Sequence, residues 1–341
     1  MPKVDAGITI DRQEFLRKLE AVSHGLSPRD IVEQSASFIL QNGEVQTFND
    51  EVCCRSASGL PDSLAGAVPH DPLLDVLRKL KEDILQVEAV EGGLELSGKG
   101  RKVHVRMEAE ILLPVDKVER PESWVPLHKD FLEALNTVQY CAGKDESRIE
   151  RICVHIHPRW LEASDNTQMA RFHLKTGFKE QTLIRRDAAR PLVQLGVTEF
   201  AETESWIHFR GPDLEYSVRR HLADYPDMTK ILEVEGEEAS LPKGMAEAAD
   251  LASVFIEKDD LVTVELKPGR VKVRGEGPRG WYTESKKASY QGRPIVFRIA
   301  PSLLGEIVKK HDQCIIREGR LKVDGGKWAY VTSLGVPESK E

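Results

Sequence analysis

The sequence predicts an α+β fold in which three similar domains follow one another along the chain. The first observation is a helical stripe of apolar residues that occurs three times, about 115 residues apart, which is close to one domain length. The second is a series of alternating apolar segments around glycine turns, which predicts antiparallel hairpins. Each third of the chain is therefore predicted to pack two helices on antiparallel sheets.

One long helix per third is predicted from apolar residues at helical spacing. The stripes run from Phe15 to Val22, from Phe131 to Val138 and from Met245 to Phe255. A shorter helix follows in each third, over residues 73–77, 192–195 and 303–308. Each shorter helix has a proline at or near its first turn, where proline loses no helical hydrogen bond.

Hairpins are predicted after every helix. Those after the long helices cover residues 37–47, 152–163 and 262–273, and those after the short helices cover residues 85–96, 206–216 and 314–323. The resulting domains are residues 1–121, 122–239 and 240–336, with a frayed tail at 337–341. Open sheets leave unpaired edges, so two such chains could close on each other, each end strand pairing with the partner's opposite end.

Composition limits the function. The 341 residues include 48 Lys and Arg against 56 Asp and Glu, a net charge of −8, which excludes a polycation that wraps nucleic acid by bulk charge. Aromatic residues make up only 6%, which argues against a base-stacking platform for single strands. The five cysteines include the adjacent Cys53 and Cys54 and no CxxC pair, which indicates a reducing cytoplasm. No apolar run is long enough to span a membrane, and no secretory signal begins the sequence.

Three local stretches, together with the threefold order, carry a family resemblance. They are residues 19–29 (LEAVSHGLSPR), residues 161–166 (LEASDN) and the run from Gly211 through Ala223-Asp-Tyr-Pro-Asp227. Over essentially its whole length the chain resembles the bacterial-type DNA sliding clamp, the DNA polymerase III beta subunit. The departures noted below are typical of a divergent clamp from a phage or a distant bacterial lineage.

The resemblance implies a DNA-clamp fold that closes into a six-domain ring as a head-to-tail homodimer. Such a ring encircles double-stranded DNA, slides along it, and tethers the replicative DNA polymerase after a clamp loader has placed it. It is a processivity factor without enzymatic activity or cofactor, in the cytoplasm and near the nucleoid, or in the host cytoplasm for a phage protein. Retention by encirclement explains how an acidic protein can hold DNA with few phosphate contacts.

The resemblance also implies site residues. DNA contacts are expected from a loop arginine and from cations on the helices: Arg29, Arg78, Lys79, Arg190, Lys309 and Lys310. A partner peptide is expected to insert between the second and third domains against Thr167, Met169, Pro226, Ile231, Val331 and Leu334. The loop Ser164–Gln168 and the C-terminal run after Ser333 depart from the family's pattern, so the peptide preference is expected to differ.

The dimer contact is implied in the same way. Val103 and Val105 lie in the first-domain edge strand, and Val254 and Phe255 align with the apolar pair opposite. The alternative interpretation is that all four belong to the core of their own domains.

Two other functions remain open from the sequence. One is a clamp-fold paralogue that is not loaded as a ring. The other is a metal-dependent hydrolase that uses His155 and His157, which alternate along one strand and so share a face, with Asp165 as a third ligand. No phosphate-binding loop of the GxxxxGK[ST] type and no GxSxG nucleophile elbow occurs, and no catalytic or metal-binding residue is assigned.

Overall fold

The fold is described from a computed structural model of the chain. The structure describes residues 7–28, 32–257, 260–311, 313–317 and 319–335. Two compact units are present. The first comprises residues 1–136, 153–158 and 175–223, and the second comprises residues 137–152, 159–174 and 224–341. Among the described residues, no helix is long and apolar enough to cross a membrane.

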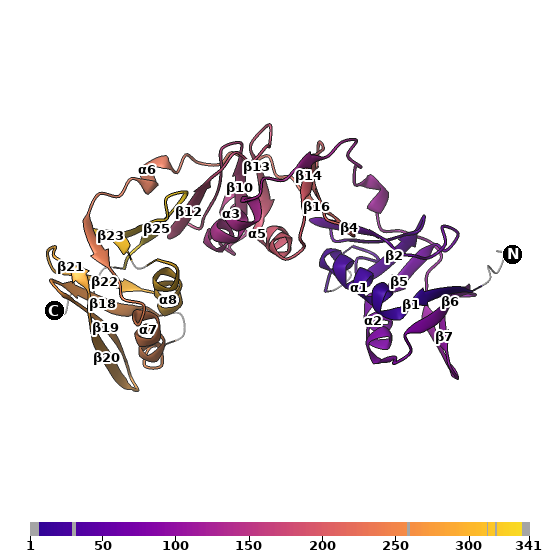
Figure 1. The fold of residues 1–341 in the computed structure, drawn as a ribbon, viewed down its shortest axis with the longest axis horizontal. Coiled ribbons are helices and arrows are strands. Elements are labelled where there is room, and N and C mark those ends of the chain that lie inside the picture. Colours follow the sequence, from indigo (N-terminus) through magenta and orange to yellow (C-terminus); the bar gives the residue numbers. More distant parts are fainter. Residues whose placement is uncertain (1–6, 29–31, 258–259, 312, 318, 336–341) are drawn as a thin grey trace. The chain divides into compact units, whose positions relative to one another are not determined.

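The first unit contains two antiparallel sheets and one further pair of strands (Figure 1). The smaller sheet has the order β1 (Ile8–Asp11), β6 (Ile84–Val90), β7 (Gly93–Gly98) and β8 (Arg101–Arg106). The larger has the order β5 (Gly66–Pro69), β2 (Ser37–Gln41), β3 (Glu44–Phe48), β4 (Val52–Ala57), β16 (Glu215–Arg219), β15 (Trp206–Arg210), β14 (Glu199–Glu202) and β9 (Val125–Pro126). Strand β10 (Cys153–His157) pairs with β13 (Thr182–Arg185).

Helices α1 (Arg12–Val22) and α2 (His70–Lys79) contact each other in the first unit. The Asp11 carboxylate caps α1 by accepting from the Glu14 amide at 2.8 Å. Phe15, Leu19 and Val22 are buried on one face, as the apolar stripe predicts. Further helical segments are η1 (Ser23–Gly25), η2 (Val115–Lys117), α3 (Phe131–Val138, which runs into the second unit), α5 (Arg186–Ala189) and η4 (Arg190–Val193).

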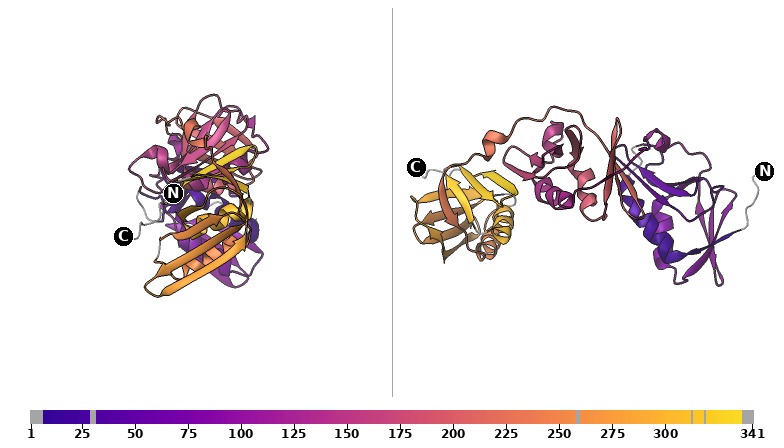
Figure 2. Two further views of the ribbon diagram at one scale, coloured as in Figure 1. Left: turned by 90° about the vertical axis from the view of Figure 1, so that its left-hand side faces the viewer. Right: turned by 45° about the horizontal axis from the view of Figure 1, so that its top comes forward.

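The second unit has the same kinds of element. One set of strands has the order β11 (Trp160–Ser164), β12 (Gln168–His173), β25 (Trp328–Ser333), β24 (Arg320–Asp324), β23 (Gln313–Arg317), β17 (Glu237–Ser240) and β21 (Ser289–Tyr290). The other sheet has the order β20 (Gly280–Lys287), β19 (Arg270–Gly277), β18 (Val262–Lys267) and β22 (Ile295–Ile299). The helical segments are η3 (Gln139–Cys141), α4 (Ile149–Ile152), α6 (Thr229–Leu232), α7 (Met245–Ser253) and α8 (Pro301–Lys310). Helices α7 and α8 lie side by side, with α7 against β19 (Figures 1 and 2).

Neighbouring repeats share sheets. In the first unit β4, from the predicted first domain, pairs with β16 from the predicted second. In the second unit β12, from the predicted second domain, pairs with β25 from the third. Contacts therefore run continuously across the expected boundaries near residues 121 and 239, and those boundaries stay a prediction.

Both the helix and the hairpin predictions are largely confirmed. The three long helices form as α1, α3 and α7, and the hairpins predicted at 37–47, 85–96, 206–216, 262–273 and 314–323 form as antiparallel strand pairs. The helix predicted at 192–195 is wrong: four α-helical residues begin earlier, at Arg186, and a 3₁₀ turn continues from Arg190 to Val193. Pro191 explains the change, because it supplies no N–H for an α-helical hydrogen bond.

Candidate partner pocket and nucleic-acid interface

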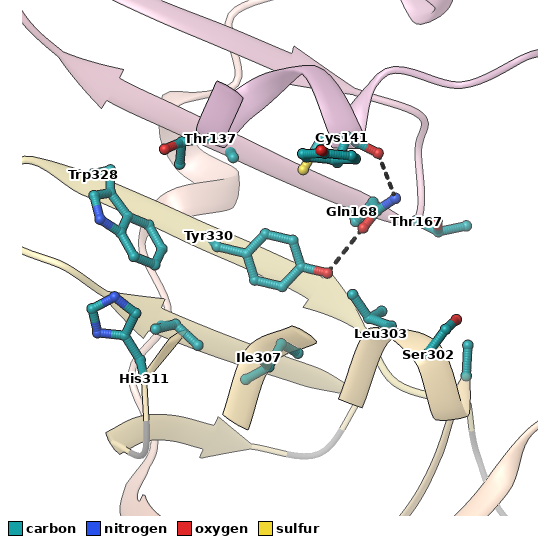
Figure 3. A pocket seen from close by; sticks show the side chains of 14 residues that line it. Thr137, Cys141, Thr167, Gln168, Ser302, Leu303, Ile307, His311, Trp328 and Tyr330 are labelled. Atoms are coloured by element: carbon teal, nitrogen blue, oxygen red, sulfur yellow. Dashed lines mark hydrogen bonds between the residues drawn. The ribbon is translucent and has the colours of Figure 1, made fainter. Parts of the chain in front are cut away.

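A pocket with a mainly apolar lining lies in the second unit, where strands β12, β24 and β25 meet helix α8 (Figure 3). It encloses about 570 Å³, within the usual range for a ligand pocket. Its walls are mostly aromatic and aliphatic. They comprise Thr137, Tyr140, Cys141, Thr167, Gln168, Ala170, Ala300, Ser302, Leu303, Ile307, His311, Val323, Trp328 and Tyr330.

Gln168 connects the two sides of this pocket (Figure 3). Its side-chain oxygen accepts from the Tyr330 hydroxyl at 3.0 Å, and its Nε2 donates to the Tyr140 carbonyl at 3.4 Å. The Asp165 carboxylate holds the preceding loop, since its Oδ1 accepts from the amides of Thr167 and Gln168 at 2.9 and 3.0 Å. The rim is therefore fixed by hydrogen bonds within the protein.

The chemistry of the pocket suits an uncharged apolar group. Trp328 and His311 meet edge to face, with ring centroids 4.5 Å apart. Burial raises the pKa of the Tyr330 hydroxyl well above its usual value, so this group stays a neutral donor. The described lining residues include no Asp, Glu, Lys or Arg. The pocket therefore offers mainly apolar contact, with the side chains of Gln168 and Thr167 as polar groups at one side.

A second apolar cluster lies on the other side chains of the same strands. Successive strand residues point to opposite faces, so Met169 and Val331 face away from Gln168 and Tyr330. Both are buried with Val234, and they are covered by half-buried residues of the segment that follows β16. We call this group the connector cluster: Met169, Val234, Val331, Met228, Ile231, Leu232 and Ile315.

Most of the predicted peptide-site residues fall in or beside this cluster. Met169, Ile231 and Val331 belong to it, and Pro226 is exposed just before it. Thr167 lines the pocket of Figure 3 instead. Leu334 is buried in the core formed by β18, β19 and the C-terminal strands, so it supports that core. The role of all six in partner binding stays a prediction.

The predicted DNA-binding residues are mostly exposed, and two are paired. Arg78 donates through Nε and Nη2 to one Glu20 oxygen at 3.1 and 2.9 Å. Lys79 lies 3.6 Å from the Asp75 carboxylate one turn earlier in α2. Arg190 and Lys309 are exposed, the side chain of Lys310 is not among those described, and Arg29 lies outside the described residues.

The predicted dimer residues are divided between core and surface. Val105 is buried and Val103 half-buried, opposite Leu94 and Leu96 of β7 on the covered face of their sheet. Val254 is 60% exposed just after α7, whereas Phe255 is half-buried. Strand β8 ends its sheet, and β20 ends the sheet in the second unit.

Histidines 155 and 157 have neighbouring rings, with centroids 6.0 Å apart. His155 is buried and His157 half-buried at the end of β10. In the part of the chain that the structure describes, no three His, Cys, Asp or Glu side chains gather in a way that could hold a metal ion.

The chain matches known proteins by its fold and not by its sequence. No protein-family model matches the chain, and no curated protein matches its sequence. A Bartonella birtlesii sliding clamp (DNA polymerase III subunit beta) bound to griselimycin aligns over 97% of this chain and 99% of its own, with a TM-score of 0.86 and 16% identity. The chain has the sliding-clamp fold.

Two further clamps agree over nearly the same length. The Pseudomonas aeruginosa clamp bound to griselimycin covers 97% of this chain and 99% of its own, with a TM-score of 0.82 and 14% identity. The beta subunit from Thermotoga maritima covers 96% and 98%, with a TM-score of 0.80 and 15% identity. The clamp fold expected from the sequence is confirmed, as is the expected divergence.

The aromatic wall of the pocket was missed by the sequence reasoning. The sequence pattern assigns no role to Trp328 and Tyr330, and it predicts Leu303 and Ile307 only as part of a helix stripe. A usable signal was present: β25 places two large aromatic side chains two residues apart on one face, in a chain with few aromatics.

Proposed function

We propose that this protein is a DNA polymerase processivity factor, a ring of two copies that encircles duplex DNA and tethers a polymerase. The proposal rests on a clamp fold that aligns over 97% of the chain and, above all, on a pattern of strand pairing that is complete twice within the chain and open at its two ends.

The pattern comes from equivalent strands in the three repeats. Strands β4, β12 and β20 are each the third strand after a long helix, and β8, β16 and β25 are each the third strand after a short helical segment. Strand β4 pairs with β16, and β12 pairs with β25. The third pairing of this series is β20 with β8. Because β20 and β8 each end a sheet, a second copy of the chain can supply the missing partner at both ends.

The two internal pairings have the same register. Counted from the turns that precede β3, β11, β15 and β24, Val52 and Gln168 occupy equivalent positions on β4 and β12, and Val218 and Thr332 on β16 and β25. Val52 pairs with Val218, and Gln168 pairs with Thr332, so both junctions agree.

The same counting sets the register of the open junction. It places Tyr282 opposite Val105 of the second copy, and Thr283 opposite His104. In this register Val103 and Val105 of one copy lie on the same sheet face as Tyr282 and Glu284 of the other copy. The predicted dimer residues at the end of α7 lie beside that face.

Charge pairing on the helices supports weak, mobile contact with DNA. Arg78 is paired with Glu20, Lys79 with Asp75, and Arg17 with Asp213 at 2.8 Å. Each phosphate that a protein neutralises adds salt-dependent affinity, so cations that are already paired add little of it. Encirclement then supplies the retention.

The pocket of Figure 3 and the connector cluster are the proposed sites for a partner peptide. Both are apolar, and both lie on β12 and β25, whose alternate residues face one or the other. Leucine, phenylalanine or similar side chains are the anchors such surfaces accept. A polymerase and a clamp loader are the expected partners.

Cysteine crosslinking tests ring closure and its register together. We expect the double variant His104→Cys/Thr283→Cys to form a disulfide between two copies at both junctions, giving a covalently closed dimer on a non-reducing gel. The five native cysteines are all buried, so they give little background. The matched control is His104→Cys/Ser285→Cys, which is two residues out of register and beyond good disulfide geometry. Equal crosslinking in both variants would reject the register.

The mass of the protein in solution distinguishes a ring of two chains from a clamp-fold paralogue that does not form a ring. Sedimentation velocity of the wild-type protein should give a species of two chains. A strict monomer at micromolar concentration would favour the paralogue.

A further inference from the structure

A buried arginine occupies the same strand position in two repeats. Counted along β3 and β11 from the turn that precedes each of these strands, Arg55 on β4 and Arg171 on β12 are each in the third residue pair, opposite Gln46 and Glu162. Their exposed fractions are 3% and 4%. The third equivalent strand, β20, has Ser285 at this position, so the hairpin itself does not require an arginine.

Each arginine reaches from its strand to the segment that connects one repeat to the next. Arg55 donates through Nη2 to the carbonyls of Val115 and Val118 at 3.1 and 2.9 Å. Arg171 donates through Nη1 to the Thr229 hydroxyl at 3.2 Å. These segments follow β8 and β16 respectively, and each carries apolar residues onto the strand face beside its arginine.

A buried network holds Arg171 in place. Its Nε and Nη2 lie 2.7 and 2.6 Å from Glu162 Oε2, and both side chains are at most 5% exposed. Trp160 donates to the other Glu162 oxygen at 2.9 Å, while the guanidinium lies 4.6 Å from its ring centroid. A buried ion pair adds little net stability over an apolar pair of similar volume. The network is therefore better explained by the position in which it fixes the Arg171 guanidinium.

The two connecting segments are held to different degrees. The first is held through two backbone carbonyls, and Val115 and Val118 are buried. The second is held through one side-chain hydroxyl, and Met228, Ile231 and Leu232 stay half-buried. The first connection is thus a fixed part of the core, whereas the second covers the connector cluster by apolar packing and by the hydrogen bond between Arg171 and Thr229.

We infer that Arg171 is a positioning residue for the partner site: through Thr229 it holds residues 228–234 over Met169 and Val331. The inference rests on the proposed peptide-binding function. It adds that the geometry of the connector cluster, and so the fit of the peptide, depends on one hydrogen bond from a residue that need not contact the peptide.

Amide hydrogen exchange tests this positioning without any partner. The variant Thr229→Val removes the acceptor and leaves the Arg171–Glu162 pair intact. We expect amide exchange over residues 228–234 to accelerate by roughly tenfold, the effect of one hydrogen bond to a charged group, with unchanged exchange over 115–118. The variant Arg171→Leu/Glu162→Leu should accelerate the same amides further, and Arg171→Lys should lie between wild type and Thr229→Val. Should the double variant fail to fold, Thr229→Val alone decides.

The matched control is Arg210→Leu/Glu199→Leu in the first unit. That pair also lies cross-strand beside a tryptophan, with Arg210 Nε 2.9 Å from Glu199 and its guanidinium 4.3 Å from the Trp124 centroid, but it is partly exposed. It should leave exchange over 228–234 unchanged. Unchanged exchange at 228–234 in Thr229→Val, or equal acceleration over 115–118, would overturn the inference.

A fluorescent peptide with leucine and phenylalanine anchors gives the functional readout. We expect Thr229→Val to weaken its binding several-fold and the control pair to leave it unchanged. If the wild type binds no such peptide, the proposed partner site fails while exchange still tests the positioning. Peptide binding that is normal in Thr229→Val, despite faster exchange, would overturn the link between the positioning and the site.

Discussion

The hydroxyl of Tyr330 donates to the side-chain oxygen of Gln168 at 3.0 Å, and this bond joins β25 to β12 at the wall of the aromatic pocket (Figure 3). The two residues come from opposite ends of the second unit's sequence. Their contact ties the loop that Asp165 holds to the wall that Trp328 and Leu303 complete.

Removing this bond is predicted to weaken partner binding more than stability. Tyr330→Phe loses one hydrogen bond, which costs about 1 kcal/mol of unfolding free energy, and it leaves the Gln168 side chain held at the rim through its Nε2. We expect several-fold weaker peptide binding in a fluorescence titration. Tyr216→Phe is the control, because Tyr216 donates to the Ala188 carbonyl at 2.8 Å in the first unit. Equal loss of peptide binding in both variants would show that the effect is general.

Truncating the connector cluster is predicted to separate partner binding from dimer formation. Ile231 is half-buried, so Ile231→Ala removes about 1 kcal/mol of apolar contact and should weaken peptide binding about fivefold. The dimer should persist in sedimentation velocity. Ile84→Ala, at an exposed position on β6, should change neither property. Loss of the dimer together with peptide binding would make Ile231 a structural residue only.

Freeing a paired arginine is predicted to tighten DNA binding. In Glu20→Gln, Arg78 loses its carboxylate partner and becomes available to phosphate. The slope of log K against log salt should steepen by about 1, as expected for one added phosphate contact. Anisotropy of a labelled duplex across a salt series measures it.

The control for this variant is Glu44→Gln, which frees Arg120 from a contact of 2.6 Å beside strand β3. Arg120 and Arg78 have similar exposure, 57% and 51%. An equal change of slope in both variants would mean that any added surface charge acts alike, and that the α1–α2 helices do not face DNA.

The protein is predicted to become less stable as the pH falls, because of His208. Burial, and next the Arg55 guanidinium, lower the pKa of His208 to about 4, and its ring contacts the hydroxyls of Ser217 and Thr203 at 2.8 and 3.0 Å. The unfolded chain takes up a proton near pH 6.5 while the folded protein does not. Unfolding free energy should therefore drop as the pH falls from about 6.5 to about 4, by up to about 3 kcal/mol. Urea denaturation at several pH values measures the drop, and His208→Gln should flatten it; an equal drop in that variant would assign it to other groups.

Much of the fold was predictable because local pattern and packing agree. The stripe from Phe15 to Val22 predicted α1, and its apolar residues are the ones that α1 buries. The same reasoning failed at residues 192–195, where Leu192 is buried as expected but Pro191 turns the backbone into a 3₁₀ segment.

The site was harder to predict than the fold. The alternation of side chains along a strand predicts that Met169 and Gln168 point to opposite faces of the sheet, but it does not predict which face stays open. That depends on what covers each face: α8 leaves a cavity over Gln168, and the segment around Ile231 covers Met169. Arg171 gave no signal either, since a charged residue on a strand is normally expected at the surface.

The central claim is that two chains close around a duplex, and topology tests it most directly. The protein is loaded onto nicked circular DNA, and the DNA is then linearised with a restriction enzyme while bound protein is measured by gel filtration. The account predicts that protein stays on the circle and leaves after linearisation, and that the crosslinked His104→Cys/Thr283→Cys dimer cannot load at all. Equal retention on the circular and the linear DNA would contradict it.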